Sequence, residues 1–275
     1  LKIFQIYKNL KYPSLKIDSY FQVYEEIFKN YIGKKITFAE VGVLGGGSLF
    51  MWKDYFGKDA RIIGIDLNPE AKKWEKYGFE IFIGSQSDEK FWNYFYDKVG
   101  KVDILLDDGG HHNKQQMTSV SVAIPNINDG GVIVVEDCHT SYMSIFGNPS
   151  KHSFINFSKH LIDKINYRFP DIGLKNKHKS EEKIFSISFY ESIVVFNINS
   201  KKCFVPEHVN STGDPYAVSD FSFTESFPTI QRFIDTKLSI LKKIPIIKKI
   251  VKILFYKKNI IWKIKEYFIL RKFFK

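Results

Sequence analysis

The first 200 residues alternate between short apolar runs and longer amphipathic stretches. The apolar runs lie at residues 38–43, 61–66, 79–83, 102–106 and 132–135. Short apolar runs of this kind are typical of strands that are buried on both faces. The amphipathic stretches predict helices at residues 18–31, 49–56, 70–77, 88–99, 113–124 and 153–169. Strands that alternate with helices predict a parallel sheet with right-handed crossovers.

Two further apolar runs follow at residues 184–190 and 192–198. A tight turn at Glu191 joins them, which predicts an antiparallel hairpin. An otherwise parallel sheet that ends in such a hairpin resembles the class I methyltransferase fold. We therefore expect an α/β, Rossmann-like chain with a mostly parallel sheet and a C-terminal hairpin.

The first predicted strand runs directly into Gly45-Gly-Gly47. Glycine permits positive φ and lets a ligand approach the backbone, so the turn that begins at Gly45 is predicted to contact a cofactor. Ser48 is predicted to cap the helix that follows. Asp66 ends the second strand, where doubly wound folds bind the ribose of a nucleotide-like cofactor.

The spacing of Glu40, Gly42 and Gly45 differs from the dinucleotide fingerprint, and no Lys-Ser/Thr pair follows the glycines. A cofactor without pyrophosphate therefore fits better, and S-adenosylmethionine (SAM) is the expected one. The alternative is that the three glycines form an ordinary loop.

Acidic residues follow several of the predicted strands. They are Glu40, Asp66, the pair Asp107-Asp108 and the pair Glu136-Asp137. The carboxyl ends of parallel strands meet at one edge of a sheet, so these acids would repel one another without a cation between them. Mg²⁺ prefers carboxylate oxygens, and Asp108, Glu136 and Asp137 are its predicted ligands. The alternative is that each acid caps a helix.

His111 and His112 follow Asp108 in a glycine-flanked loop. The usual pKa of histidine suits proton removal at neutral pH, so His111 is predicted to be a general base in preference to His112. His139 is a candidate for binding the substrate.

Over about residues 14–200 the chain resembles the metal-dependent sugar O-methyltransferases of the macrocin O-methyltransferase type, which are related to proteins labelled cephalosporin hydroxylase. The matching motifs are Glu40-Val-Gly-Val-Leu-Gly-Gly-Gly-Ser-Leu49, Gly64-Ile-Asp66, Gly84-Ser-Gln-Ser-Asp88, Asp107-Asp-Gly-Gly-His111 and Val135-Glu-Asp137. The resemblance implies metal ligands at Asp108, Glu136 and Asp137, and a base at His111. It implies a SAM site lined by Glu40, Gly42, Asp66, Gln86 and Asp107.

The chain departs from the pattern of this family at two positions. Gly110 stands where many relatives have serine, and Ser188 stands where histidine is expected. The second departure puts any substrate contact at Ser188 in doubt. The domains implied are an N-terminal helical segment (1–32), the SAM-binding core (33–200), a loop region (201–236) and a basic amphipathic helical tail (237–275).

The net charge of +11 is concentrated at the C-terminal end of the chain. Residues 237–275 hold 13 Lys or Arg and one acid, whereas the other 236 residues hold 28 bases and 29 acids. The near-neutral body argues against nucleic acid as a partner. A basic amphipathic tail with aromatic residues is typical of segments that lie on anionic membranes. Packing on the body, packing on a second subunit of a homo-oligomer, and RNA binding are the alternatives.

The sequence therefore predicts a SAM-dependent, Mg²⁺-assisted O-methyltransferase whose acceptor is a sugar or glycan, in surface polysaccharide biosynthesis (capsule or lipopolysaccharide). Cys138 and Cys203 offer no disulfide framework, so a cytoplasmic location is expected, peripheral to the inner face of the membrane. The alternatives are a phosphate-type or small-metabolite acceptor, an RNA-binding methyltransferase and a non-catalytic SAM sensor.

Overall fold

The computed structural model describes residues 1–147, 150–169, 183–213 and 267–274. The chain divides into two compact units, residues 1–207 and residues 208–275. The first unit contains the sheet and every site residue predicted above. The predicted tail, apart from residues 267–274, lies outside the described residues, and so does most of the predicted loop region.

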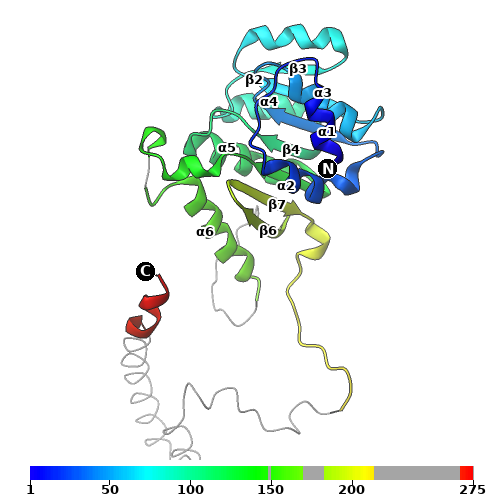
Figure 1. Cartoon of the computed structure of the whole chain (residues 1–275). Helices are drawn as coiled ribbons and strands as arrows, with labels where there is room; N and C mark the ends of the chain where they lie inside the picture. The colour runs from blue at the N-terminus through cyan, green and yellow to red at the C-terminus, as the bar shows by residue number, and fades with distance from the viewer. Residues whose placement is uncertain (148–149, 170–182, 214–266, 275) are drawn as a thin grey trace, which may run out of the picture. The chain divides into compact units, whose positions relative to one another are not determined.

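A seven-stranded sheet forms the centre of the first unit, in the order β3-β2-β1-β4-β5-β7-β6. The first five strands pair in parallel, and β7 runs antiparallel to both β5 and β6. The strands are β1 (Thr37–Val41), β2 (Arg61–Asp66), β3 (Glu80–Ile83), β4 (Val102–Asp107), β5 (Ile127–Val135), β6 (Ile184–Tyr190) and β7 (Ile193–Ile198). This order confirms the predicted parallel sheet with its terminal hairpin (Figure 1).

Helices cover both faces of the sheet (Figure 1). They are α1 (Lys2–Lys8), α2 (Tyr20–Phe28), α3 (Gly47–Phe56), α4 (Glu89–Val99), α5 (Asn113–Ala123) and α6 (Phe154–Asn166). One core lies between α1–α3 and the sheet, and a second lies between α4–α6 and the opposite face. Neighbouring residues of β1 divide between them, since Phe38 packs in the first core and Ala39 in the second. This explains why the strands are continuous apolar runs.

Short 3-10 helices complete the described chain, at Lys29–Tyr31, Pro69–Tyr77, Ile124–Asn126, Cys138–Tyr142, Ser144–Phe146, Ser200–Lys202 and Arg271–Phe274. In the part of the chain that the structure describes, no helix is both long enough and apolar enough to cross a bilayer.

The structure corrects several predicted boundaries. Ser48 is not a helix cap, because α3 begins at Gly47 and Gly46 takes the capping position with φ +78°. Asp18 does not cap α2, which begins at Tyr20. Residues 128–131 lie before the predicted strand 132–135 but belong to β5, where the pairing with β4 is irregular. Helix α1 lies within the predicted N-terminal helical segment (1–32), but no separate helix was predicted there, because its mixed Lys and apolar residues show no clear helical face.

Gly46 meets two constraints at once, a positive φ and a close neighbour. A Cβ there would lie 2.2 Å from Cε2 of Trp74. We predict that Gly46→Ala lowers the free energy of unfolding by about 2–4 kcal/mol, from the left-handed backbone and the clash together.

Gly78→Ala is the matched control, since Gly78 has φ +88° with nothing within 4 Å of the added Cβ. It should cost only the backbone strain, about 1–2 kcal/mol. Urea unfolding measures both variants. Equal losses would contradict the role assigned to the contact with Trp74.

Candidate active site

A cleft of about 690 Å³ opens at the carboxyl ends of the central strands. Its walls include the β1 exit loop, the end of β2, the loop after β3, the β4–α5 loop and the β5 exit. Open α/β sheets bind ligands at this edge. Eight of its lining residues were singled out from the sequence, namely Gly42, Asp66, Gln86, Asp108, His111, Glu136, Asp137 and His139.

Three predicted cofactor residues do not line the cleft. Glu40 and Asp107 are fully buried beneath it. A Cβ on Gly45 would lie 2.6 Å from the carbonyl oxygen of Pro13, so this glycine makes room for the N-terminal segment. The role of these residues toward a cofactor stays a prediction.

Asp66 shapes the glycine-rich loop through its side chain. Its Oδ2 accepts hydrogen bonds from the backbone N–H groups of Val43 (2.8 Å) and Leu44 (3.1 Å). Its Oδ1 accepts from the N–H of Asn68 (2.8 Å). The carboxylate thus holds the β1 and β2 exits together where the ribose is predicted to bind.

Gln86 holds the β4–α5 loop in place through its side chain. Its Nε2 donates to Asp107 Oδ1 (2.9 Å), and its Oε1 accepts from the backbone N–H of Gly110 (2.9 Å). Gly109 is needed here, because a Cβ would lie 2.0 Å from Gln86 Oε1. Burial raises the pKa of Asp107, and the hydrogen bonds from Ser119 and Gln86 oppose that shift. The buried pair fixes the loop that carries Asp108 and His111.

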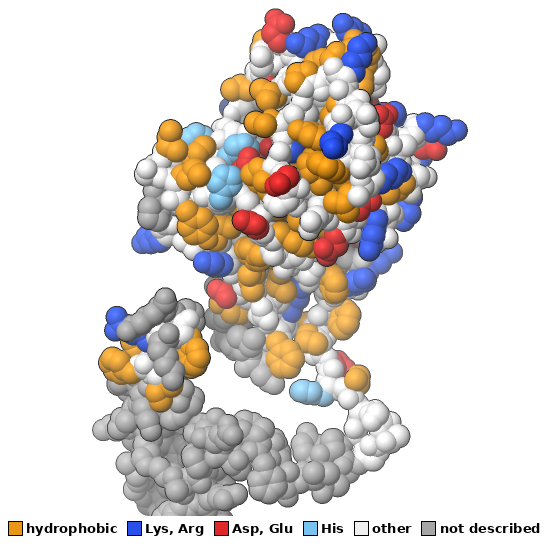
Figure 2. Space-filling view, viewed as in Figure 1, with side chains coloured by type: hydrophobic (Ala, Val, Ile, Leu, Met, Phe, Trp, Pro, Cys, Tyr) orange, Lys and Arg blue, Asp and Glu red, His pale blue; other side chains and the backbone are white. Residues whose placement is uncertain are grey.

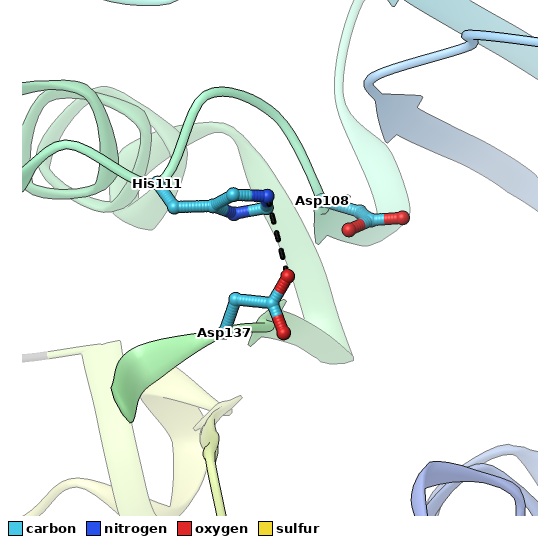
Figure 3. Close-up of side chains that lie close together, drawn as sticks. All are labelled: Asp108, His111 and Asp137. Carbon is cyan, nitrogen blue, oxygen red and sulfur yellow. Dashed lines mark ion pairs between the residues drawn. The ribbon is translucent and has the colours of Figure 1, made fainter. Parts of the chain in front are cut away.

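Asp108, His111 and Asp137 form a compact cluster in the cleft. One ligand atom from each lies within 4.8 Å of the others, and His111 Nε2 is 3.2 Å from Asp137 Oδ2. Figure 3 shows the imidazole of His111 above the carboxylate of Asp137, with Asp108 across from them. Among the described residues, the buried His111 Nδ1 has no hydrogen-bond partner. Carboxylate oxygens beside an imidazole fit a hard divalent cation and a base.

Backbone strain is concentrated around this cluster. Among the described residues, four other than glycine have positive φ, namely Leu44 (44°), His111 (57°), Asp137 (54°) and Ser192 (64°). Three of them line the cleft, and the fourth, Ser192, contacts His139. Such conformations persist where the surrounding structure enforces them, often at functional sites.

Lys16 joins the acids in the wall of the cleft, a contact that no pattern in the sequence predicts. Its Nζ lies 2.6 Å from Asp108 Oδ2, 3.2 Å from Glu136 Oε2 and 3.5 Å from Glu40 Oε1. The Lys16 side chain is only 1% exposed. Burial opposes its charge, but the attraction of Asp108, Glu136 and Glu40 outweighs this and holds the Lys16 pKa well above its usual value.

The predicted ligand Glu136 is therefore already paired. It accepts hydrogen bonds from Lys16 and from the hydroxyl of Tyr24. Burial and the nearby charge of Asp108 raise its pKa. Glu40 accepts from Ser48 Oγ (2.6 Å) and Trp52 Nε1 (3.1 Å), and burial raises its pKa.

A second network supports Asp137 from α2 and the β6–β7 turn. The Tyr20 hydroxyl donates to Asp137 Oδ1 (2.6 Å) and lies 2.8 Å from Ser192 Oγ. Ser192 Oγ also bonds His139 Nδ1 at 2.5 Å. Burial raises the pKa of Tyr20, so its hydroxyl stays a donor. The i, i+4 spacing of Tyr20 and Tyr24 could have indicated that both point toward the same wall.

Three large apolar side chains are exposed in the segment that follows the acid pair along the chain. Tyr142, Met143 and Ile145 are 64%, 43% and 80% exposed. Figure 2 shows histidine side chains grouped beside hydrophobic ones on one side of the body.

No family model matches the chain. Its fold matches crystal structures of MycE, a methyltransferase of mycinamycin biosynthesis. The complex with Mg and SAH gives a TM-score of 0.65 at 24% identity, covering 77% of this chain and 57% of MycE. The complex that also contains mycinamycin VI gives a TM-score of 0.61 at 25% identity. That match covers 72% of this chain and 54% of MycE. The class I methyltransferase fold is confirmed.

The curated relatives are sugar O-methyltransferases of antibiotic pathways. A tetracenomycin-C rhamnosyl 2'-O-methyltransferase of Streptomyces olivaceus is 29% identical over 64% of this chain and 49% of its own length. The mycinamicin VI 2''-O-methyltransferase of Micromonospora griseorubida is 31% identical over 53% of this chain and 39% of its own length. The demethylmacrocin O-methyltransferase of Streptomyces fradiae is 26% identical over 69% of this chain and 49% of its own length.

These matches confirm the resemblance found in the sequence: the chain is similar to sugar O-methyltransferases over 53–69% of its length. It spans about half the length of the curated relatives that it matches.

Proposed function

We propose that the chain is a SAM-dependent O-methyltransferase that acts on a sugar hydroxyl with the help of a divalent cation, Mg²⁺ being the expected one. The observation that carries the proposal is the cluster of Asp108, His111 and Asp137, which faces the same cleft as Gly42 and Asp66. The Mg and SAH in the MycE structures and the sugar acceptors of the relatives support it.

Asp108 and Asp137, with Glu136 behind them, would hold the cation. When bound, it would act as a Lewis acid and template that acidifies an adjacent sugar hydroxyl. His111 is the base that accepts the hydroxyl proton, and the Asp137 carboxylate, 3.2 Å from His111 Nε2, stabilises the resulting imidazolium. Tyr20 holds that carboxylate in place through its 2.6 Å hydrogen bond.

The deprotonated oxygen attacks the methyl carbon of SAM. A new O–CH₃ bond forms as the S–CH₃ bond breaks, and S-adenosylhomocysteine (SAH) leaves. Asp66 binds the ribose hydroxyls, and the common sheet edge aligns donor and acceptor. A non-catalytic SAM sensor is disfavoured, because sensing requires no base beside the acids.

The metal and His111 can be tested together by measuring methyl transfer to a glycoside acceptor. EDTA should abolish the reaction and Mg²⁺ should restore it. His111→Gln should lower kcat by about 10²- to 10⁴-fold, because a positioned base is lost.

His160→Gln is the matched control, since His160 lies on the exposed surface of α6 and does not line the cleft. It should keep full activity. Methyl transfer that survives both chelation and His111→Gln would refute the mechanism.

The distribution of charge along the chain suggests which molecule carries the sugar that is methylated. Residues 237–275 carry 13 of the 41 Lys and Arg residues, and aromatic residues lie among them. We infer that they attach the enzyme to an anionic membrane surface at its cytoplasmic face. The acceptor would then be a glycan of a surface polysaccharide assembled there, such as capsule or lipopolysaccharide. Each Lys or Arg near such a surface adds about 1 kcal/mol of attraction.

Liposome flotation tests this part separately. The full chain should float with vesicles that contain phosphatidylglycerol and should dissociate at high salt, because the attraction is electrostatic. A chain ending at Asp235 should stay at the bottom of the gradient. Equal flotation of the two chains would remove the membrane proposal and leave the methyl-transfer proposal intact.

A further inference from the structure

Lys16 stands where a cation shared by two of the predicted metal ligands would stand. Its ammonium contacts Asp108 Oδ2 at 2.6 Å and both Glu136 carboxylate oxygens at 3.2 Å. Mg²⁺ binds carboxylate oxygens at about 2.0–2.1 Å. An ion bound by Asp108 and Glu136 together would therefore occupy nearly the same place as the ammonium.

Backbone hydrogen bonds hold the segment that carries Lys16 at both ends, since the carbonyl oxygen of Ile17 accepts from Tyr20 N–H (3.1 Å). We call residues 13–17 the strap. The carbonyl oxygen of Pro13 accepts from Gly47 N–H (3.1 Å), and that of Ser14 accepts from the Tyr7 hydroxyl (2.8 Å). Leu15 and Ile17 are 81% and 41% exposed, whereas the side chain of Lys16 between them is buried. The Lys16 ion pairs thus hold the middle of the strap against the protein.

The strap also forms part of the cleft wall. Leu15, Lys16 and Ile17 line the same cleft as Asp66 and Asp108. Any movement of Lys16 away from the acids would change the wall of the predicted SAM and acceptor site.

We propose that Lys16 is the resident cation of the metal site, and that a divalent ion enters by displacing its ammonium from Asp108 and Glu136. This inference rests on the metal site of the proposed function. Like charges repel, and a divalent ion attracts the two carboxylates more strongly than an ammonium does. Displacement frees Lys16 and releases the strap at Leu15 and Ile17, so metal loading opens the wall of the cleft.

The number of acids at this site explains why an ammonium occupies it until a metal ion replaces it. Glu40, Asp108 and Glu136 converge on one ammonium, and Asp137 adds a fourth carboxylate close by. Buried carboxylates without a nearby cation are strongly unfavourable, so the ammonium keeps the cluster paired before the metal arrives.

The test compares Lys16→Met with Lys11→Met, without cofactor or acceptor. Lys11 lies just before the strap, with its ammonium over the ring of Tyr12, and contacts none of the acids. In isothermal titration with Mg²⁺, Lys16→Met should bind at least tenfold more tightly than the unsubstituted protein, because the competing ammonium is gone. Lys11→Met should be unchanged.

Hydrogen–deuterium exchange of the unsubstituted protein gives a readout that needs no variant. Amides of residues 14–17 should exchange faster when Mg²⁺ is added, and in Lys16→Met they should be fast without it. Two results would overturn the proposal. One is that Lys16→Met binds Mg²⁺ no more tightly than Lys11→Met does. The other is that Mg²⁺ leaves the exchange rates of the strap amides unchanged. Failure of the unsubstituted protein and of Lys16→Met alike to bind Mg²⁺ would instead refute the metal site of the proposed function.

Discussion

Buried negative charge at the carboxyl edge of the sheet is the constraint on which the site depends. Glu40 at the end of β1, Asp107 at the end of β4 and Glu136 at the end of β5 are at most 1% exposed. A buried carboxylate is tolerated only when donors or cations compensate for lost hydration. Asp107 is satisfied by Gln86, whereas Glu40 and Glu136 share Lys16. Every nearby element therefore contributes a donor to this edge.

The same constraint links the N-terminal segment to the chemistry. Helix α2 supplies two tyrosines, of which Tyr24 donates to Glu136 and Tyr20 donates to Asp137. The strap supplies the ammonium. Residues before the first strand thus complete a site whose acids come from β4 and β5. The proposed reaction uses the resulting geometry, in which a base and two partly buried acids line the cofactor cleft.

Most of the sheet and several residues of the cleft could be predicted from the sequence. The apolar runs gave the strands, because buried parallel strands need side chains on both faces that avoid water. The acids at the strand ends gave the cluster, because parallel strands bring their carboxyl ends to one edge. The position of Asp66 in the cleft followed from the same rule, and those of Gly42 and Gln86 followed from the resemblance to the methyltransferase family.

Other features could not be predicted, for physical reasons. Lys16 is 92 residues from Asp108 along the chain and lies in a segment without periodicity, so only tertiary packing brings them together. Glu40 and Asp107 were expected to line the cofactor site, but a strand pattern does not show how deeply a terminal side chain is buried. The strained φ of His111 and Asp137 likewise depends on neighbours distant in sequence.

The central claim is that acids from β4 and β5 hold a divalent cation beside a base and the cofactor. Anomalous diffraction from crystals grown with Mn²⁺ and SAH tests it most directly. The account predicts one Mn²⁺ peak in contact with Asp108 and Asp137, with His111 and the SAH sulfur facing the same space. A peak elsewhere, or SAH bound away from Asp66 and His111, would contradict it.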